Sequence, residues 1–163
     1  MLNTSPRFSF DQALLRWYQR NGRKNLPWQQ NKTRYSVWIS EIMLQQTRVA
    51  QGLPYYEKFI SHYPTVHDLA NAPEDSVLKD WQGLGYYSRA RNLHATAKKV
   101  SAEMQGQFPN TFKGLLALKG VGDYTASAIA SICFDLPTAV VDGNVCRVLS
   151  RYFGIDTPIN STS

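Results

Sequence analysis

A turn formed by Gly120, Val121 and Gly122 separates two segments whose apolar residues follow a helical period. A glycine turn of this kind ends one helix and leaves the backbone N–H groups at the start of the next helix exposed. The helix dipole favours an anion at that end, and we interpret this anion as a nucleic-acid phosphate. About twenty residues later, Asp142 precedes another helical pattern. One short stretch of chain can therefore hold a phosphate backbone and present a carboxylate to it.

The rest of the chain also follows helical spacing. Period-two alternation is absent and β-branched residues recur at helical intervals, so we predict an all-α fold. Ser9 begins a sequence typical of a capping box for the first helix, Thr65 is expected to cap another, and residues 25–28 are expected to form an extended loop fixed by Pro27. The predicted helices cover residues 10–21, 35–45, 48–62, 65–71, 73–82, 88–105, 111–118, 123–134 and 143–153.

Composition limits the class of protein. With 163 residues, of which 43% are hydrophobic, the chain can form a real core in one domain or two small ones. Eighteen Lys and Arg against twelve Asp and Glu give a net charge of +6, which favours a polyanionic partner. No apolar run approaches the roughly 20 residues that cross a bilayer, so we expect a cytoplasmic protein with no membrane partner. Cys133 and Cys146 lack Cys-x-x-Cys spacing, and we interpret them as core residues.

Glu41 lies in a segment that is otherwise nearly all apolar. Loss of hydration there would raise its pKa towards the range of a general acid. In the alternative interpretation, Glu41 points into solvent at the helix edge or caps a neighbouring backbone. Together with Asp142 it forms a pair of acids that can differ in protonation, which is the arrangement that cleavage of a glycosidic bond requires.

Two polar loops are candidates for contacts with nucleic-acid bases. The run Gln45, Gln46 and Thr47 can enter a base stack or bind base edges, or it is simply a polar helix C-terminus. Tyr86, in the glycine-containing turn 83–89, can wedge into or stack on a base, or the turn is a helix C-cap with two core tyrosines. We interpret four basic residues that follow as a solvated basic face with at most one or two phosphate contacts: Arg89, Arg91, Lys98 and Lys99.

Five motifs, at residues 26–28, 38–47, 83–94, 120–122 and 141–145, together resemble those of the MutY-type adenine DNA glycosylases in the endonuclease III superfamily. The resemblance extends from about residue 8 to the end of the chain. It implies the helix-hairpin-helix DNA glycosylase fold, with a six-helix domain over 31–137 that contains the hairpin at about 111–134. Residues 1–30 and 138–163 would belong to a second, truncated lobe. The implied reaction is removal of adenine mispaired with 8-oxoguanine or guanine in double-stranded DNA, by flipping the adenine into a pocket.

The resemblance also implies roles for single residues. Glu41 would protonate the adenine, Asp142 would stabilise or capture the oxocarbenium ion, and Tyr124 and Asn144 would support these two. Backbone carbonyls would hold a monovalent cation at the hairpin, from Leu116, Leu118 and Val121. Contacts with DNA or its bases would come from Trp28, Leu44, Gln46, Thr47, Leu84, Tyr86, Gly120, Gly122 and Thr125.

Two further features refine the resemblance. Bifunctional lyases place a lysine nucleophile two residues after the second hairpin glycine, where this chain has Tyr124, so we expect a monofunctional hydrolase. Complete members carry a four-cysteine [4Fe-4S] cluster beyond the aspartate-bearing helix, whereas Cys133 and Cys146 lack the ligand spacing. We therefore expect an N-terminal catalytic fragment that holds no cluster, is a monomer, acts in the bacterial nucleoid and is weak or inactive alone.

Two alternative functions remain. A non-catalytic helix-hairpin-helix module would bind DNA by its phosphates, but it has no need of Glu41, whose charge would repel a polyanion. A glycosylase and lyase acting on oxidised pyrimidines is disfavoured because Tyr124 replaces the lysine.

Overall fold

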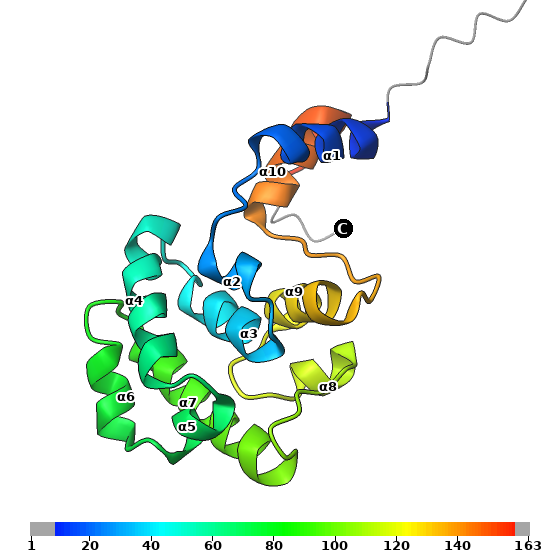
Figure 1. Ribbon diagram of the computed structural model, residues 1–163. Coiled ribbons are helices and arrows are strands. Elements are labelled where there is room, and N and C mark those ends of the chain that lie inside the picture. Colours follow the sequence, from blue (N-terminus) through cyan, green and yellow to red (C-terminus); the bar gives the residue numbers. More distant parts are fainter. Residues whose placement is uncertain (1–8, 159–163) are drawn as a thin grey trace, which may run out of the picture.

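The computed structural model describes residues 9–158, and this part of the chain is helical without strands, which confirms the all-α prediction (Figure 1). The helices of the described part are α1 (Phe10–Asn21), α2 (Pro27–Gln30), α3 (Arg34–Met43), α4 (Val49–His62), α5 (Val66–Asn71), α6 (Glu74–Asp80), α7 (Tyr87–Glu103), α8 (Phe112–Leu116), α9 (Asp123–Phe134) and α10 (Gly143–Phe153).

Local chemistry explains where the helices differ from the sequence predictions. The extended loop predicted around Pro27 is wrong at its end, because this proline opens the one-turn helix α2, whose first position has no need of an N–H group. The capping box predicted for α1 is also wrong, because the Ser9 hydroxyl donates to the Asp11 carboxylate and makes no cap bond. The cap predicted at Thr65 is confirmed, since its side chain accepts the backbone N–H of Asp68.

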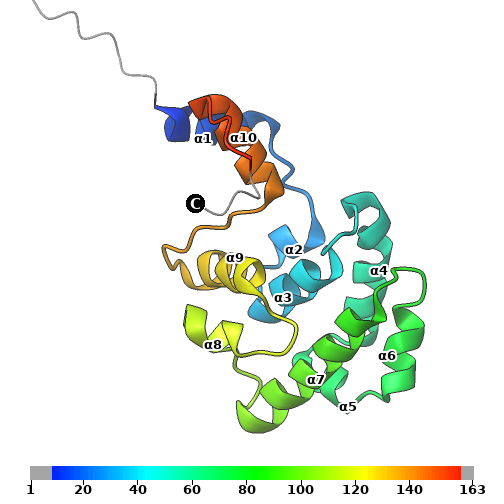
Figure 2. The same ribbon diagram turned by 180° about the vertical axis from the view of Figure 1, so that it is seen from behind.

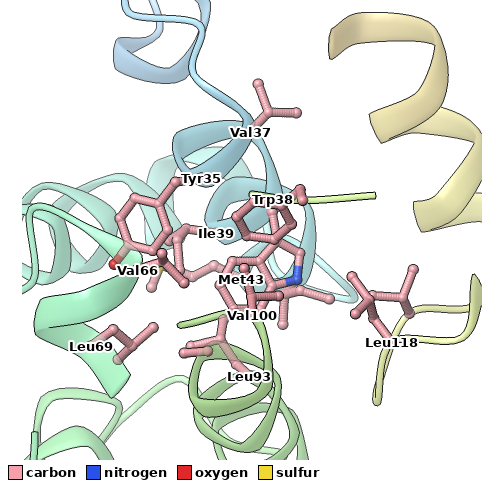
Figure 3. Packing of buried hydrophobic residues seen from close by; sticks show 14 of the residues in the cluster. Tyr35, Val37, Trp38, Ile39, Met43, Val66, Leu69, Leu93, Val100 and Leu118 are labelled. Atoms are coloured by element: carbon pink, nitrogen blue, oxygen red, sulfur yellow. The ribbon is translucent and has the colours of Figure 1, made fainter. Parts of the chain in front are cut away.

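Helix α3 runs through the centre of the hydrophobic core, with eight of its ten residues buried. It packs against α9 on one side and contacts α4 and α7 on others, while α5 packs along α7. Figure 3 shows apolar side chains of α3 gathered with those of α5, α7 and the segment that precedes α9. The labelled residues of this group are Tyr35, Val37, Trp38, Ile39, Met43, Val66, Leu69, Leu93, Val100 and Leu118.

Helices α1 and α10 lie side by side at a distance from this core, although they come from opposite ends of the described chain (Figures 1 and 2). The rings of Phe10 and Tyr152 join them, with centroids 4.4 Å apart. Neither helix has a buried residue, and large apolar side chains such as Leu15, Trp17 and Phe153 are more than half exposed. The two helices therefore contribute little to the core that α3 organises.

Candidate functional site

A cleft of about 1010 Å³ opens where two loops and the starts of two helices meet. These segments are the loop between α3 and α4, the loop between α6 and α7, the start of α9 and the start of α10. The cleft thus brings together side chains that are far apart in the sequence. Predicted site residues that line it are Leu44, Gln46, Thr47, Tyr86, Gly122, Tyr124, Thr125, Asp142 and Asn144.

Four helices begin at this cleft. The N-cap residues of α4, α7, α9 and α10 are Arg48, Tyr86, Gly122 and Asp142, and each of them lines it. The N-terminus of a helix carries a partial positive charge and N–H groups without intrahelical partners, so the arrangement favours an anion. Sequence analysis identified the α9 terminus for this role, and the fold adds those of α4 and α7, whereas at α10 the Asp142 carboxylate is itself the anion at the helix N-terminus.

Asp142 is held in place by hydrogen bonds at the start of α10. Its Oδ1 accepts the backbone N–H of Val145 at 2.8 Å, and its Oδ2 accepts the Asn144 side-chain amide at 2.9 Å. The bond from Val145, and then the bond from Asn144, hold the pKa of the Asp142 carboxyl below its ordinary value. The cleft therefore contains an ionised carboxylate of fixed orientation, with Asn144 as its partner.

Glu41 lies in the last turn of α3 and is half-buried. Loss of hydration raises the pKa of its carboxyl, in the direction that its apolar neighbours led us to expect. Glu41 is not among the residues that line the cleft, but it is close to one that is. Burial raises the pKa of Tyr124, and the charges of Glu41 and Asp142 raise it further, so the phenol lies within electrostatic reach of both carboxylates.

Thr125 and Gln45 bond to each other across the cleft. Gln45 Nε2 donates to Thr125 Oγ1 at 3.1 Å, which joins the loop after α3 to the first turn of α9. The Thr125 side chain is only 2% exposed. The hydroxyl for which the sequence predicted a DNA contact is thus engaged inside the protein, and Gln45 has a structural partner that the sequence did not indicate.

Three predicted contact residues lie outside the cleft lining. Trp28 is buried in the core, where its ring meets that of Tyr56 edge to face at 5.0 Å. Leu84 is also buried, whereas Gly120 is exposed in the hairpin and has a φ of +79°. The hairpin is tied to α7, because the Thr96 hydroxyl donates to the carbonyl of Lys119 at 2.9 Å.

The resemblance implies two metal groups. At the hairpin, the Leu118 carbonyl accepts the Val121 N–H at 3.1 Å, and the monovalent cation implied there stays a prediction. Cys133 and Cys146 are free, half-buried thiols. Among residues 9–158, no group of three or more His, Cys, Asp or Glu side chains could hold a metal, so this part of the chain does not fit an iron–sulfur cluster.

The interpretation of Arg89 as part of a solvated basic face is wrong. Arg89 is only 9% exposed, lines the inner wall of the cleft and donates hydrogen bonds to the carbonyl groups of Gln45 and Gly85, one in each neighbouring loop. The sequence contained a signal for this burial. Arg89 precedes Leu93 by four residues and Val100 by eleven, so it lies on the buried stripe of α7. Arg91, by contrast, is exposed and lies 3.7 Å from Glu74.

Comparisons with known proteins identify relatives of similar sequence. The chain is 48% identical over 149 residues to the adenine DNA glycosylase of Buchnera aphidicola subsp. Acyrthosiphon pisum (strain APS), covering 91% of this chain and 43% of that protein. It is 45% identical over 163 residues to the adenine DNA glycosylase of Homo sapiens, covering 94% of this chain and 30% of that protein. The chain therefore spans less than half the length of these relatives.

Solved structures of similar fold include a thermostable thymine-DNA glycosylase, with a TM-score of 0.82 and 32% identity, covering 89% of this chain and 67% of that one. Endonuclease III in a non-covalent DNA complex has a TM-score of 0.77 and 22% identity, covering 93% of this chain and 68% of that one, and indicates the fold alone.

No helix in the described part of the chain is both long and apolar enough to span a bilayer. Residues 39–162 match the family described as "HhH-GPD superfamily base excision DNA repair protein". The chain belongs to this superfamily.

Proposed function

We propose that the protein is a monofunctional adenine DNA glycosylase. Its substrate is adenine mispaired with 8-oxoguanine or guanine in double-stranded DNA, and its reaction is hydrolysis of the N-glycosidic bond. The proposal is carried by one observation: Tyr124 and the hydrogen-bonded Asp142 carboxylate line the same cleft, and the charges of Asp142 and of Glu41, at the end of α3, both raise the pKa of Tyr124. The relatives named adenine DNA glycosylase support the choice of base.

The chemistry needs both protonation states. Adenine leaves deoxyribose poorly as an anion, so the protonated Glu41 carboxyl gives its proton to the adenine ring. The C–N bond then breaks, its electron pair departs with the base, and the sugar carbon becomes positive. The ionised Asp142 stabilises this cation until water adds to it. Tyr124 stands where a lyase would have an amine nucleophile, so the reaction ends at hydrolysis.

DNA binding follows from the surroundings of these carboxyl groups. Helix N-termini at the cleft hold phosphates, and the helix-hairpin-helix at Gly120 to Gly122 follows the backbone of one strand. The exposed Gln46 and Tyr86, the latter 65% exposed, reach the base opposite the adenine and the gap that the flipped adenine leaves. We propose that the enzyme acts as a monomer on the DNA of the bacterial nucleoid.

The direct test compares Glu41→Gln and Asp142→Asn with wild type in the complete protein. Each variant should lower the single-turnover rate of adenine release by about 100-fold or more, because a general acid or a charge stabiliser is lost. Binding to the mismatched duplex should remain. The exposed Glu57 on α4 offers a matched control, Glu57→Gln. Near-normal excision by either active-site variant would remove the catalytic assignment of that residue.

We further propose that residues 1–163 alone act weakly on DNA, since they correspond to less than half of the relatives' length. In a multiple-turnover assay on an adenine–8-oxoguanine duplex, this chain should release adenine far more slowly than the complete protein. Comparable turnover by the two would contradict this part of the proposal.

A further inference from the structure

A single guanidinium group joins two loops of the cleft. Nη1 of Arg89 faces the end of α3 and the loop that follows, and Nη2 faces the loop before α7. The carbonyl oxygens that accept from Nη1 are those of Ile42 at 3.2 Å, Met43 at 2.9 Å and Gln45 at 2.6 Å, and those that accept from Nη2 are those of Leu84 at 3.3 Å and Gly85 at 3.2 Å. Arg89 thus fixes the backbone of one loop relative to the backbone of the other.

Each of these loops carries a non-glycine residue in the left-handed region. Gln46 has a φ of +55° and Tyr86 a φ of +49°, conformations that an L-residue adopts only when its surroundings impose them. The Arg89 guanidinium also lies 5.6 Å from the centroid of the Tyr86 ring and 5.3 Å from that of Trp81. The two strained residues are those that the proposed function assigns to the opposing base and the gap.

Burial of the Arg89 side chain is energetically unfavourable. Its hydrogen bonds go to neutral groups, the backbone carbonyls and the Thr47 hydroxyl at 3.4 Å, and its buried Nε–H has no partner among residues 9–158. A buried cation that is balanced only by dipoles lowers the stability of the fold relative to an apolar residue at the same position. A lysine lacks the planar guanidinium with its two Nη groups, and its single ammonium group cannot donate to the carbonyl groups of both loops at once. Such a cost is expected where a side chain holds a functional conformation rather than the core.

We propose that Arg89 is a positioning residue that sets the relation between Gln46 and Tyr86, and thereby the discrimination between 8-oxoguanine and guanine opposite adenine. The inference rests on the proposed function. Arg89 donates to loop carbonyls and not, among the described residues, to the carboxylates of Glu41 and Asp142. Its loss should therefore weaken recognition of the duplex while the bond-breaking step, once the substrate is bound, proceeds nearly as before.

The experiment uses Arg89→Lys in the complete protein, with Arg91→Lys, on the same helix but exposed, as the control. Affinity and single-turnover rate at saturation are measured on adenine–8-oxoguanine and adenine–guanine duplexes. Arg89→Lys should weaken binding of the 8-oxoguanine duplex by about tenfold and reduce its preference over guanine, with the saturated rate within about threefold of wild type. Equal loss of rate on both duplexes at unchanged affinity, or no change at all, would overturn the proposal.

A measurement on the wild-type protein covers the case in which Arg89→Lys does not fold. A guanidinium held by five carbonyl groups cannot rotate freely, so NMR should resolve separate, slowly exchanging Nη proton signals for Arg89, whereas those of the exposed Arg91 should be averaged. Averaged signals for Arg89 would refute the positioning role. This readout does not depend on catalysis. Failure of wild type to excise adenine would refute the proposed function and the discrimination built on it, whereas the spectrum would still decide whether Arg89 holds the two loops together.

Discussion

At the scale of single residues, Glu41 and Asp142 show how two carboxyl groups, both within electrostatic reach of Tyr124, acquire different properties. Glu41 is half-buried in an apolar helix, so its charged form loses hydration. Asp142 caps a helix and accepts hydrogen bonds from Val145 and Asn144, so its charged form is favoured. The first environment is visible in the sequence as a run of apolar neighbours, and the second as an aspartate that precedes a helical pattern.

These displaced pKa values predict the pH dependence of excision. In the proposed mechanism Glu41 acts while protonated, and its pKa is raised, so the rate should stay high above the ordinary glutamate range and fall once pH exceeds the raised pKa. Asp142 acts while ionised, and its pKa is lowered from 3.8, so its protonation should reduce the rate only at still lower pH. Single-turnover rates of the complete protein across pH test this. A rate that rises through the alkaline range would contradict Glu41 as the acid.

Other residues of the site could not be placed from the sequence. Arg89 was interpreted from its charge, but its burial follows from its position on the apolar stripe of α7. The bond between Gln45 and Thr125 joins residues 80 positions apart, and nothing local in either segment indicates it. Such long-range pairs depend on how the helices pack, which periodicity alone does not determine.

At the scale of secondary-structure elements, the hairpin between α8 and α9 was predicted from its glycines, and its attachment to α7 was not. Gly120 adopts a φ of +79° and lies directly against Asn92 of α7. Gly122, the N-cap of α9, has an ordinary φ of −92° and open space around it. The two glycines therefore have different reasons for being glycine: Gly120 for conformation and close packing, and Gly122 for access to its backbone.

This difference gives a paired prediction for stability. In Gly120→Ala, the new Cβ would lie 2.8 Å from Asn92 Cβ, in addition to the strained φ, so the free energy of unfolding should fall by about 1–3 kcal/mol. In Gly122→Ala, the new Cβ meets nothing within 4 Å, so only the weaker N-cap preference of alanine counts and the loss should stay below about 1 kcal/mol. Urea denaturation measures both. Equal destabilisation by the two substitutions would show that Asn92 does not restrict the hairpin.

At the scale of the whole molecule, the described chain consists of a core organised by α3 and a separate pair formed by α1 and α10 (Figures 1 and 2). The sequence predicted all three helices from their periodicity, with α3 ending two residues earlier than expected. Their unequal burial could not be predicted from periodicity, because α10 is strongly amphipathic and still has no buried residue. An amphipathic sequence shows that a helix has an apolar face, but only the fold shows whether other residues pack against that face.

We therefore expect unequal protection from hydrogen exchange in the chain of residues 1–163. Amides of α3 and α9, which pack against each other, should exchange slowest, through opening of the whole core. Amides of α1 and α10 should exchange orders of magnitude faster, because few buried contacts oppose their local opening. Mass spectrometry of proteolytic fragments after labelling measures the difference. Protection of α1 equal to that of α3 would indicate that the helix pair is as stable as the core.

The convergence of four helix N-termini on one cleft has a consequence for ionic strength. The charged side chains that line the cleft are two arginines and two aspartates, Arg48, Arg89, Asp123 and Asp142, so their formal charges cancel. If DNA binds here as proposed, its attraction to the cleft comes from backbone dipoles, and the net charge of +6 arises from residues outside the cleft. Binding through such dipoles releases fewer counterions than binding through lysine and arginine, so it weakens less as salt is added. Nonspecific DNA binding should therefore be lost at lower salt concentrations than binding of the proposed mismatch at the cleft.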